Sequence, residues 1–248
     1  MKRTVIAVTF AFTCGLVSNN VMASGSIHWG YSGEGGPENW GKLAQEFALC
    51  SAGKNQSPVD IADMINGNLA DLAFAYQASG TEVHNNGHAI QVNYQPGSTL
   101  TAGGSIFELK QFHFHSPSEN TIAGKSFPLE AHFVHADTNG DLAVVAVMYE
   151  EGEQNAELDK AWTQMPTEAG QKAALKETVD ANKLLPEDKD YYYFNGSLTT
   201  PPCTEGVRWF VLKTSGSVSK EQVEKFAHVM HHPNNRPVQP LNARLINE

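Results

Sequence analysis

The sequence predicts a β-rich α+β fold, a single domain with short peripheral helices. Short segments that alternate apolar and polar residues recur along the chain, and turn signals such as Pro96-Gly97 and Asn139-Gly140 separate them. Helical patterns are few and short. The 248 residues would allow one large domain or two small ones, but neither a linker nor an internal repeat divides them. The chain is therefore long enough to bury one sizeable core.

The N-terminus has the pattern of a secretory signal peptide. Lys2 and Arg3 precede an apolar run over residues 5–17, and a short polar stretch leads to Ala23. The apolar run is too short for an ordinary membrane span, although it could also form a strand. We expect residues 1–23 to be a signal peptide and residues 24–248 to form the domain, in a periplasmic or secreted protein.

Charge and cysteine content restrict the partners. Cleavage after Ala23 reduces the 17 basic residues to 15 against 27 acidic ones, a net charge of −12. This acidity argues against nucleic acid and against a membrane as partners. Cys14 leaves with the signal peptide, whereas Cys50 and Cys203 remain. An even number of cysteines in an exported protein suggests a disulfide, and two free buried thiols are the alternative.

The elements follow in order. Residues 24–41 are irregular and aromatic, and residues 55–61 are extended because Ser57 precedes Pro58. Strand-like runs cover residues 72–77, 89–94, 106–115, 129–135, 142–149, 191–195 and 207–213. Helical patterns cover residues 157–164 and 171–182. A capping box at Ser219-Lys220-Glu221-Gln222 opens a further helix, which ends before Pro233.

Three histidines lie on two neighbouring predicted strands. His113 and His115 alternate with Phe112 and Phe114, so both imidazoles share one face of their strand. In the next strand His132 shares a face with Glu130 and Val134. If the two strands pair, the three rings can converge on one point.

Three neutral ring nitrogens without a thiolate suit Zn²⁺ with an open fourth position, which is a catalytic arrangement. Glu130 and Gln111 stand two residues before His132 and His113, where they can accept the second N–H of each ring. The alternative is two exposed strand histidines and one hydrogen-bonded core histidine.

Other residues could complete such a site. Glu119 lies just past His115 in a loop, where it could equally be a solvated carboxylate. Residues 195–203 form a polar loop that two adjacent prolines make rigid. His88 follows Asn85-Asn86-Gly87, a turn signal, and could exchange protons near neutral pH.

The motifs together resemble those of the α-class carbonic anhydrases. They are Gln111-Phe112-His113-Phe114-His115, Glu130-Ala131-His132-Phe133-Val134, Asn85-Asn86-Gly87-His88 and Gly196-Ser197-Leu198-Thr199-Thr200-Pro201-Pro202. The similarity runs from His28-Trp29-Gly30-Tyr31 to Asn235-Arg236-Pro237. Ser116-Pro117-Ser118-Glu119-Asn120 and the two cysteines resemble the bacterial, exported branch.

The resemblance implies a large, mostly antiparallel twisted central sheet with zinc at the bottom of a conical cleft. It implies reversible hydration of carbon dioxide to bicarbonate and a proton, by attack of zinc-bound hydroxide. In carbonic anhydrases zinc lowers the pKa of bound water to about 7. His113, His115 and His132 would be the zinc ligands, with Gln111 and Glu130 as acceptors behind them.

The resemblance also assigns roles around the metal. Glu119 would accept the hydroxyl proton of Thr199, which orients the nucleophile, and Thr200 would help to hold bicarbonate. His88 would be the proton shuttle, with Tyr31 and Asn86 shaping the water network beside it. The pocket for carbon dioxide would be apolar and formed by Val134, Val144, Leu198, Val207 and Trp209. The same five residues could otherwise be ordinary core residues.

Further expectations from the resemblance concern covalent structure and ligands. A Cys50–Cys203 disulfide and cis bonds before Pro58 and Pro202 are implied. Anion or sulfonamide-type inhibitors and a monomer or homodimer are also expected. The chain departs from many animal members at three positions, Ser116 and Asn235 replacing Trp and Asn120 replacing His, and none of them is a ligand.

Two other functions compete with this one. A catalytically silent carbonic-anhydrase-like binding module would lack a ligand or the Thr/Glu pair, and all five residues are present. A zinc hydrolase would be expected to carry His-Glu-x-x-His, which the sequence does not contain.

Overall fold

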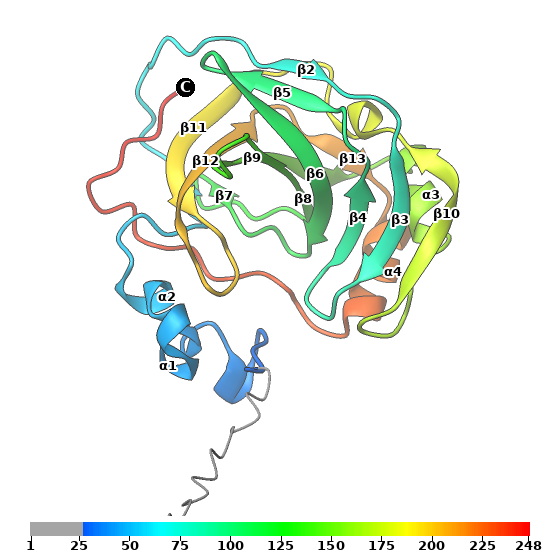
Figure 1. The fold of residues 1–248 in the computed structure, drawn as a ribbon, viewed down its shortest axis with the longest axis horizontal. Helices are drawn as coiled ribbons and strands as arrows, with labels where there is room; N and C mark the ends of the chain where they lie inside the picture. Colours follow the sequence, from blue (N-terminus) through cyan, green and yellow to red (C-terminus); the bar gives the residue numbers. More distant parts are fainter. Residues whose placement is uncertain (1–26) are drawn as a thin grey trace, which may run out of the picture.

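A computed structural model describes residues 27–248, so the predicted signal peptide lies outside the described residues. Figure 1 shows a strongly curved sheet with helices at its margins. The strands are β1 (Asp60–Ile61), β2 (Ala73–Ala75), β3 (Gly80–Asn85), β4 (Ile90–Tyr94), β5 (Thr99–Ala102), β6 (Ser105–His115), β7 (Thr121–Ile122), β8 (Leu129–Ala136), β9 (Leu142–Glu151), β10 (Lys172–Val179), β11 (Tyr191–Ser197), β12 (Glu205–Leu212) and β13 (Gly216–Val218).

An 11-stranded sheet organises the molecule. Its main path is β10-β3-β4-β6-β8-β9-β12-β11, β13 pairs with β9, and β2 joins β6 through β5. The pairs are antiparallel except that β12 and β13 run parallel to β9. β1 and β7 form a separate parallel pair. The expected large, mostly antiparallel sheet is therefore confirmed.

The helices are short and peripheral, as predicted. They are α1 (Trp40–Leu43), α2 (Leu49–Ala52), α3 (Ala156–Trp162) and α4 (Lys220–Met230), with 3-10 turns η1 (Gly33–Gly35), η2 (Gln45–Phe47) and η3 (Ala181–Leu184). The predicted capping box begins α4, where the Ser219 hydroxyl accepts from the Gln222 backbone N–H. Within residues 27–248 no helix has the length and apolarity needed to cross a membrane.

The helix predicted over residues 171–182 is wrong. Most of that segment is β10, which pairs antiparallel with β3, and η3 follows it. Its Ala, Leu, Lys and Glu residues favour helix locally, but the free edge of β3 supplies backbone partners. Ala173 and Leu175 pack against the core, and Lys172 lies 3.0 Å from Glu82 across the pair. Tertiary pairing therefore overrides helix propensity here.

Alternation along the central strands divides the buried residues between two faces of the sheet. Phe112, Phe114, Ala131 and Phe133 belong to the larger hydrophobic cluster, which α3 and α4 help to cover through Trp162 and Phe226. The opposite face carries the three histidines and a second cluster that includes Val144 and Trp209.

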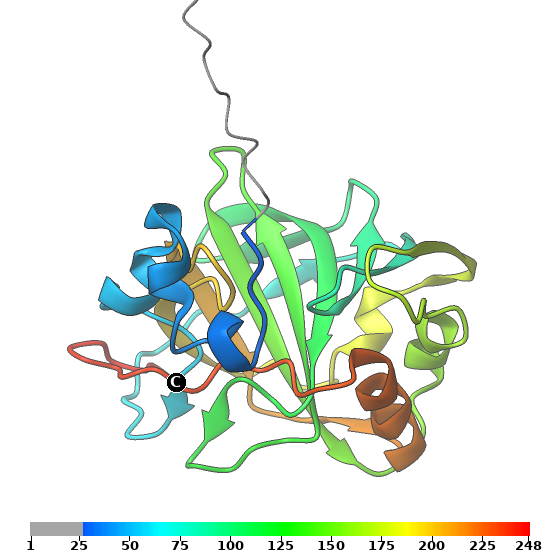
Figure 2. The same ribbon diagram turned by 90° about the horizontal axis from the view of Figure 1, so that it is seen from below.

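The C-terminal segment crosses the molecule. Figure 2 shows it, in red, running from α4 to the side where the N-terminal helices lie. Arg236 anchors it there, because its buried guanidinium donates to the carbonyls of Cys50 and Ser57 and to the side chain of Gln56. Segments almost 190 residues apart are thereby joined beside the histidines.

Candidate metal centre and active site

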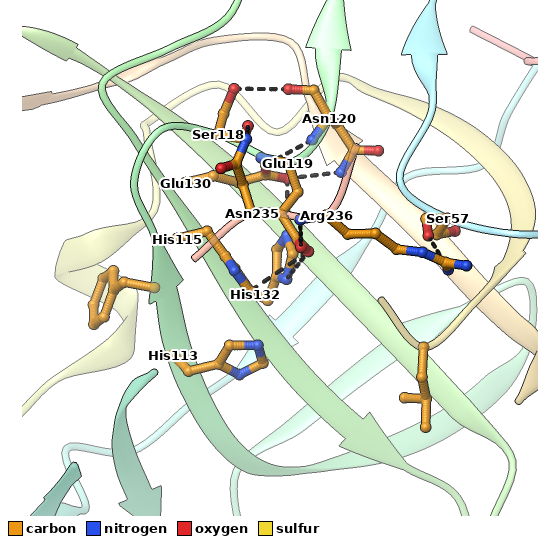
Figure 3. A network of polar contacts seen from close by, with 12 residues as sticks. Ser57, His113, His115, Ser118, Glu119, Asn120, Glu130, His132, Asn235 and Arg236 are labelled. Atoms are coloured by element: carbon orange, nitrogen blue, oxygen red, sulfur yellow. Dashed lines mark hydrogen bonds and ion pairs between the residues drawn. The ribbon is translucent and has the colours of Figure 1, made fainter. Parts of the chain in front are cut away.

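The three histidines converge as predicted. β6 and β8 pair antiparallel, with His113 opposite His132 and His115 opposite Glu130. One ring nitrogen from each histidine lies within 4.8 Å of the other two. Figure 3 shows the three rings gathered on one side of the sheet. Their positions follow from the two-residue period of a strand and from the register between two strands.

Each ring is held by an acceptor for its outer nitrogen. The Nδ1–H of His113 donates to Gln111 Oε1 at 2.9 Å, and the Nε2–H of His132 donates to Glu130 Oε1 at 2.9 Å. Both partners were predicted. This leaves His113 Nε2 and His132 Nδ1 with free lone pairs, the arrangement that metal-binding histidines use.

The acceptor for His115 was missed by the sequence analysis. Its Nδ1–H donates to the carbonyl oxygen of Asn234 at 2.7 Å. The Asn234 side chain also accepts from the Ser116 N–H and donates to the Phe114 carbonyl. Asn234 therefore positions the end of β6 from the C-terminal segment, and no local pattern marks it.

The electrostatics favour neutral rings. Burial lowers the pKa of all three histidines, and neighbouring histidines lower those of His113 and His132 further, to well below the usual value. Neutral imidazoles can bind a cation without first losing a proton. His115 Nε2 is also buried without a hydrogen-bond partner. Such an orphaned nitrogen, in a set of three neutral nitrogen donors, fits a divalent metal.

Glu130 connects His132 to the loop after β6. Its carboxylate accepts from the backbone N–H groups of Glu119 and Asn120 at 2.6 and 2.9 Å and from the Asn120 amide at 2.7 Å. Asn120 Oδ1 in turn accepts from the Val59 N–H. Burial raises the pKa of Glu130, while the Asn120 amide lowers it. Asn120 was noted in the sequence only as a departure, and it helps to orient Glu130.

Glu119 is buried beside the rings and is not a solvated loop residue. Its Oε1 accepts from the Arg236 backbone N–H at 2.8 Å. Its Oε2 lies 3.5 Å from His115 Nε2 and has no conventional hydrogen-bond partner. Burial raises the pKa of Glu119 well above its usual value, although the Arg236 N–H and the Thr199 hydroxyl act in the opposite direction. The structure therefore brings Thr199 close to Glu119.

The loop that carries Thr199 is tied down at several points. The Leu198 N–H donates to the Thr204 carbonyl, and the Cys203 N–H donates to the Thr200 carbonyl. Ser57 and Ser197 exchange two hydrogen bonds, at 2.9 and 3.1 Å. The expected Cys50–Cys203 disulfide is present. The expected cis bonds before Pro58 and Pro202 are also present, with a third before Pro117.

The five predicted apolar residues gather in one place. Val144, Val207 and Trp209 are buried in the second hydrophobic cluster. Val134 and Leu198 are partly buried and pack against it. The Trp209 ring lies 4.9 Å from the His132 ring between centroids, in an edge-to-face arrangement. An apolar wall therefore adjoins the three nitrogens.

A cavity of about 160 Å³ opens beside the histidines. It is lined by Trp29, Tyr31, Asn86, His88, Ala89, Gln91, Gln111, His113, His115 and Thr200. The predicted Tyr31, Asn86, His88 and Thr200 are thus brought together. Trp29 and Gln91 were not predicted, although Gln91 sits opposite His113 in the pairing of β4 and β6.

His88 sits at the turn between β3 and β4. The Asn86 side-chain oxygen accepts from the backbone N–H groups of His88 and Ala89, which closes an Asx turn. The Tyr31 hydroxyl is buried without a hydrogen-bond partner. Polar groups therefore extend from the three rings toward the surface.

The chain is similar to known proteins over nearly its whole length. The family model described as eukaryotic-type carbonic anhydrase matches residues 35–248. A carbonic anhydrase of Neisseria gonorrhoeae is 51% identical over 248 residues, 99% of this chain and 98% of its own.

Two solved structures agree with this similarity. The α-carbonic anhydrase of Thermovibrio ammonificans, in complex with the inhibitor sulfanilamide, is 52% identical with a TM-score of 0.89, covering 90% of this chain and all of its own. The α-carbonic anhydrase of Photobacterium profundum is 53% identical with a TM-score of 0.85, covering 89% of this chain and all of its own.

Fold, site and relatives define the class of protein. A curved sheet presents three convergent imidazoles, with a cavity, a buried carboxylate and an apolar wall beside them, and this donor set is able to hold a metal ion. The chain belongs to the α-carbonic anhydrase family, and it is an enzyme of that family.

Proposed function

We propose that this enzyme catalyses the zinc-dependent, reversible hydration of carbon dioxide to bicarbonate and a proton. The observation that carries the proposal is the convergence of three neutral ring nitrogens within 4.8 Å of one another, beside Glu119 and the apolar wall. Family membership at about 50% identity supports the same reaction.

The metal would be held by His113 Nε2, His115 Nε2 and His132 Nδ1, the three nitrogens whose ring partners are already hydrogen-bonded. Bound zinc would supply a Lewis acid that makes hydroxide available at neutral pH, as it does in carbonic anhydrases generally. The absence of thiolate from this donor set favours a catalytic over a structural site.

Thr199 and Glu119 would orient the nucleophile. An ionised Glu119 can only accept, so it would take the Thr199 hydroxyl proton and leave the Thr199 oxygen as an acceptor toward the cleft. A donor placed there is held in one orientation, which lowers the entropic part of the barrier. Burial acts against the ionised form of Glu119 that this role needs, whereas the hydrogen bonds from the Arg236 N–H and the Thr199 hydroxyl favour it.

Carbon dioxide is small and apolar, so it needs space and exclusion of water more than polar contacts. Val134, Val144, Leu198, Val207 and Trp209 would receive it beside His132. Thr200 lines the cavity near the ligand rings and would help to hold bicarbonate.

His88 would carry the product proton out of the cleft. Burial lowers its pKa from the ordinary value of 6.5, so the ring is neutral at pH 7 and can accept a proton. Tyr31 and Asn86 line the space between His88 and the metal ligands and would order the water through which the proton moves.

Inhibitors and location follow from the same assignment. We propose inhibition by anions and sulfonamides, which would occupy the cleft beside Thr199. Sulfanilamide is the inhibitor in the Thermovibrio ammonificans complex. We also propose export to the periplasm or the exterior as a monomer or homodimer, with residues 1–23 removed. The Cys50–Cys203 disulfide supports an oxidising location.

A stopped-flow assay of carbon dioxide hydration with a pH indicator tests the proposal. Purified wild type should contain zinc and hydrate carbon dioxide, whereas His113→Ala should lose the metal and nearly all activity, because two nitrogens hold zinc poorly. His228→Ala, an exposed histidine of α4, is the matched control and should retain both. Folded, zinc-replete wild type without activity would instead favour the silent binding module.

A further inference from the structure

Three histidines from separate segments lie near one another. His88 comes from the turn between β3 and β4, His28 from the N-terminal segment and His232 from the segment after α4. Both His28 and His232 are exposed and lie close enough to His88 to lower its pKa, after burial as the larger cause. When protonated, each of these two histidines disfavours a proton on His88.

His88 is fixed relative to the segment that carries His232. The Asn234 side-chain amide donates to the His88 backbone carbonyl at 3.0 Å, and the same amide donates to the Phe114 carbonyl. The His88 ring stacks on Trp29, with centroids 3.6 Å apart and planes within 8°. The turn and the ring are thus held from two sides, and His232 lies only two residues before Asn234.

His232 is oriented to accept a proton. Its Nδ1–H donates to the Pro233 carbonyl at 2.9 Å, which leaves the Nε2 lone pair free. Its ring lies 6.0 Å from the Tyr31 ring, and the Tyr31 ring lies 5.8 Å from Trp29, the residue on which His88 stacks. An aromatic wall therefore connects the two imidazoles, one half-buried in the cleft and one exposed.

We propose that His232 is a second proton-transfer residue, which takes the proton from His88 at the mouth of the cleft and delivers it to buffer. This inference rests on the proposed function, because it needs a reaction that releases one proton per turnover. His232 does not touch the substrate and acts through His88.

The transfer is balanced. One N–H bond of the His88 imidazolium breaks and an N–H bond forms at His232 Nε2, directly or through intervening water. His232 then gives up that proton to a buffer base, and both rings return to the neutral state. No oxidant, reductant or other reactant is needed.

The first test compares turnover in weak and strong buffer. His232→Asn should lower kcat in weak buffer by roughly twofold to fivefold, less than the loss of a directly acting acid–base group, and leave kcat/KM unchanged. High concentrations of imidazole buffer should restore kcat, because they take the proton from His88 directly. A kcat equal to that of wild type in weak buffer would overturn the proposal.

Two control variants distinguish proton transfer through His232 from the effects of charge and of a surface substitution. His231→Asn changes an equally exposed neighbour whose ring lies toward His228, and its left-handed backbone, with φ of 63°, suits Asn. It should behave as wild type. His232→Lys carries a permanent positive charge but cannot accept a proton near neutral pH. It should resemble His232→Asn, whereas wild-type behaviour would show that only charge matters and would refute the relay.

A double variant tests whether the two histidines act in series. In weak buffer His88→Ala should itself slow turnover, and adding His232→Asn should cause no further loss. If the two losses multiply instead, His232 acts independently of His88 and the proposal is wrong.

A titration by NMR supplies a readout that does not depend on activity. The pKa of His88 should rise in His232→Asn and stay unchanged in His231→Asn, because only the first removes a histidine that lowers the His88 pKa. An unchanged His88 pKa in His232→Asn would contradict the proximity on which the relay depends. If the enzyme is active but its kcat does not depend on His232, only the relay is refuted. If zinc-loaded wild type is inactive, the proposed function is refuted, and the relay with it.

Discussion

At the scale of single residues, each of the three convergent histidines depends on one acceptor that sets its ring. Gln111 and Glu130 could be predicted because each stands two residues before its histidine on the same strand face. Asn234 could not, because it reaches His115 across 119 positions of sequence. Acceptors on the same strand are therefore readable from sequence, and acceptors from another segment are not.

The Thr199 hydroxyl should contribute to rate and not to metal binding. Thr199→Ala should keep zinc but lose roughly 2–3 kcal/mol of transition-state stabilisation, as expected for loss of one positioning hydrogen bond. Thr199→Ser retains the hydroxyl and should retain most of the rate. Zinc content and stopped-flow rates measured together check this, and a fully active Thr199→Ala would exclude the role of the Thr199–Glu119 pair.

His135 should make the protein sensitive to acid. Its ring is buried on the face opposite the metal ligands, where Nε2 accepts from the Tyr76 hydroxyl at 2.6 Å and Nδ1–H donates to the Ala143 carbonyl at 3.2 Å. Burial lowers its pKa from 6.5 to about 4. Below pH 6.5 the unfolded chain binds a proton that the folded one excludes, so stability falls as the pH drops toward 4.

The variant His135→Gln removes this titration. Between about pH 6.5 and pH 4, the free energy of unfolding should fall less steeply than in wild type, by up to about 1.4 kcal/mol per pH unit. Urea unfolding at several pH values measures the difference. Tyr76→Phe, which keeps the imidazole, should be less stable at every pH but keep the wild-type slope. Equal slopes for His135→Gln and wild type would show that His135 is not the acid-sensitive group.

At the scale of elements, pairing between strands determined the secondary structure where local propensity favoured another form. The segment 171–182 has the composition of a helix, yet the edge of β3 recruits most of it as β10. β3 itself was not predicted, and the unpaired edge that it offers to β10 could therefore not be predicted either. The neighbouring strands β6 and β8 were predicted because their side chains alternate between two faces, and β9 was predicted because it is a continuous apolar run of strand length.

The disulfide should stabilise the loop between β11 and β12. It joins Cys50, in α2, to Cys203, four residues after Thr199, and closes a span of 153 residues. Cys50→Ser should lower the melting temperature, with a loss of at most about 4–5 kcal/mol in the chain-entropy account. Hydrogen exchange should accelerate at the Leu198 and Cys203 amides, which donate within this loop.

A suitable control is reduction of the wild-type protein. The reduced form should match Cys50→Ser in melting temperature and in exchange, since both lack the same bond. A melting temperature in Cys50→Ser equal to that of the oxidised parent would contradict the stabilising role.

At the scale of the whole molecule, the three-histidine site stands on a frame that contacts within the chain hold together. The larger hydrophobic cluster lies on the sheet face opposite the three ligands. The ligand rings are already held by Gln111, Glu130 and Asn234. The site is therefore organised by hydrogen bonds within the chain.

Removal of zinc by a chelator should consequently lower the melting temperature without unfolding the sheet. Ligand binding to the folded state alone stabilises it by about 4 kcal/mol when free ligand exceeds the Kd a thousandfold. The far-ultraviolet circular dichroism of the metal-free protein should remain that of the loaded form, and added zinc should restore both melting temperature and activity. Collapse of the β signal on chelation would show that the metal is part of the folding framework.

The sequence by itself determined the β-rich class, the three convergent histidines and two of their acceptors, because side-chain alternation along a strand is a local property. It also identified the family, and through the family it anticipated the Cys50–Cys203 bond and the residues around the cleft. Only the tertiary structure decided that β10 is a strand, that Asn234 orients His115 and that His232 stands beside His88. Each of those facts depends on segments far apart in the chain, which come together only when the sheet curves and the C-terminal segment crosses it.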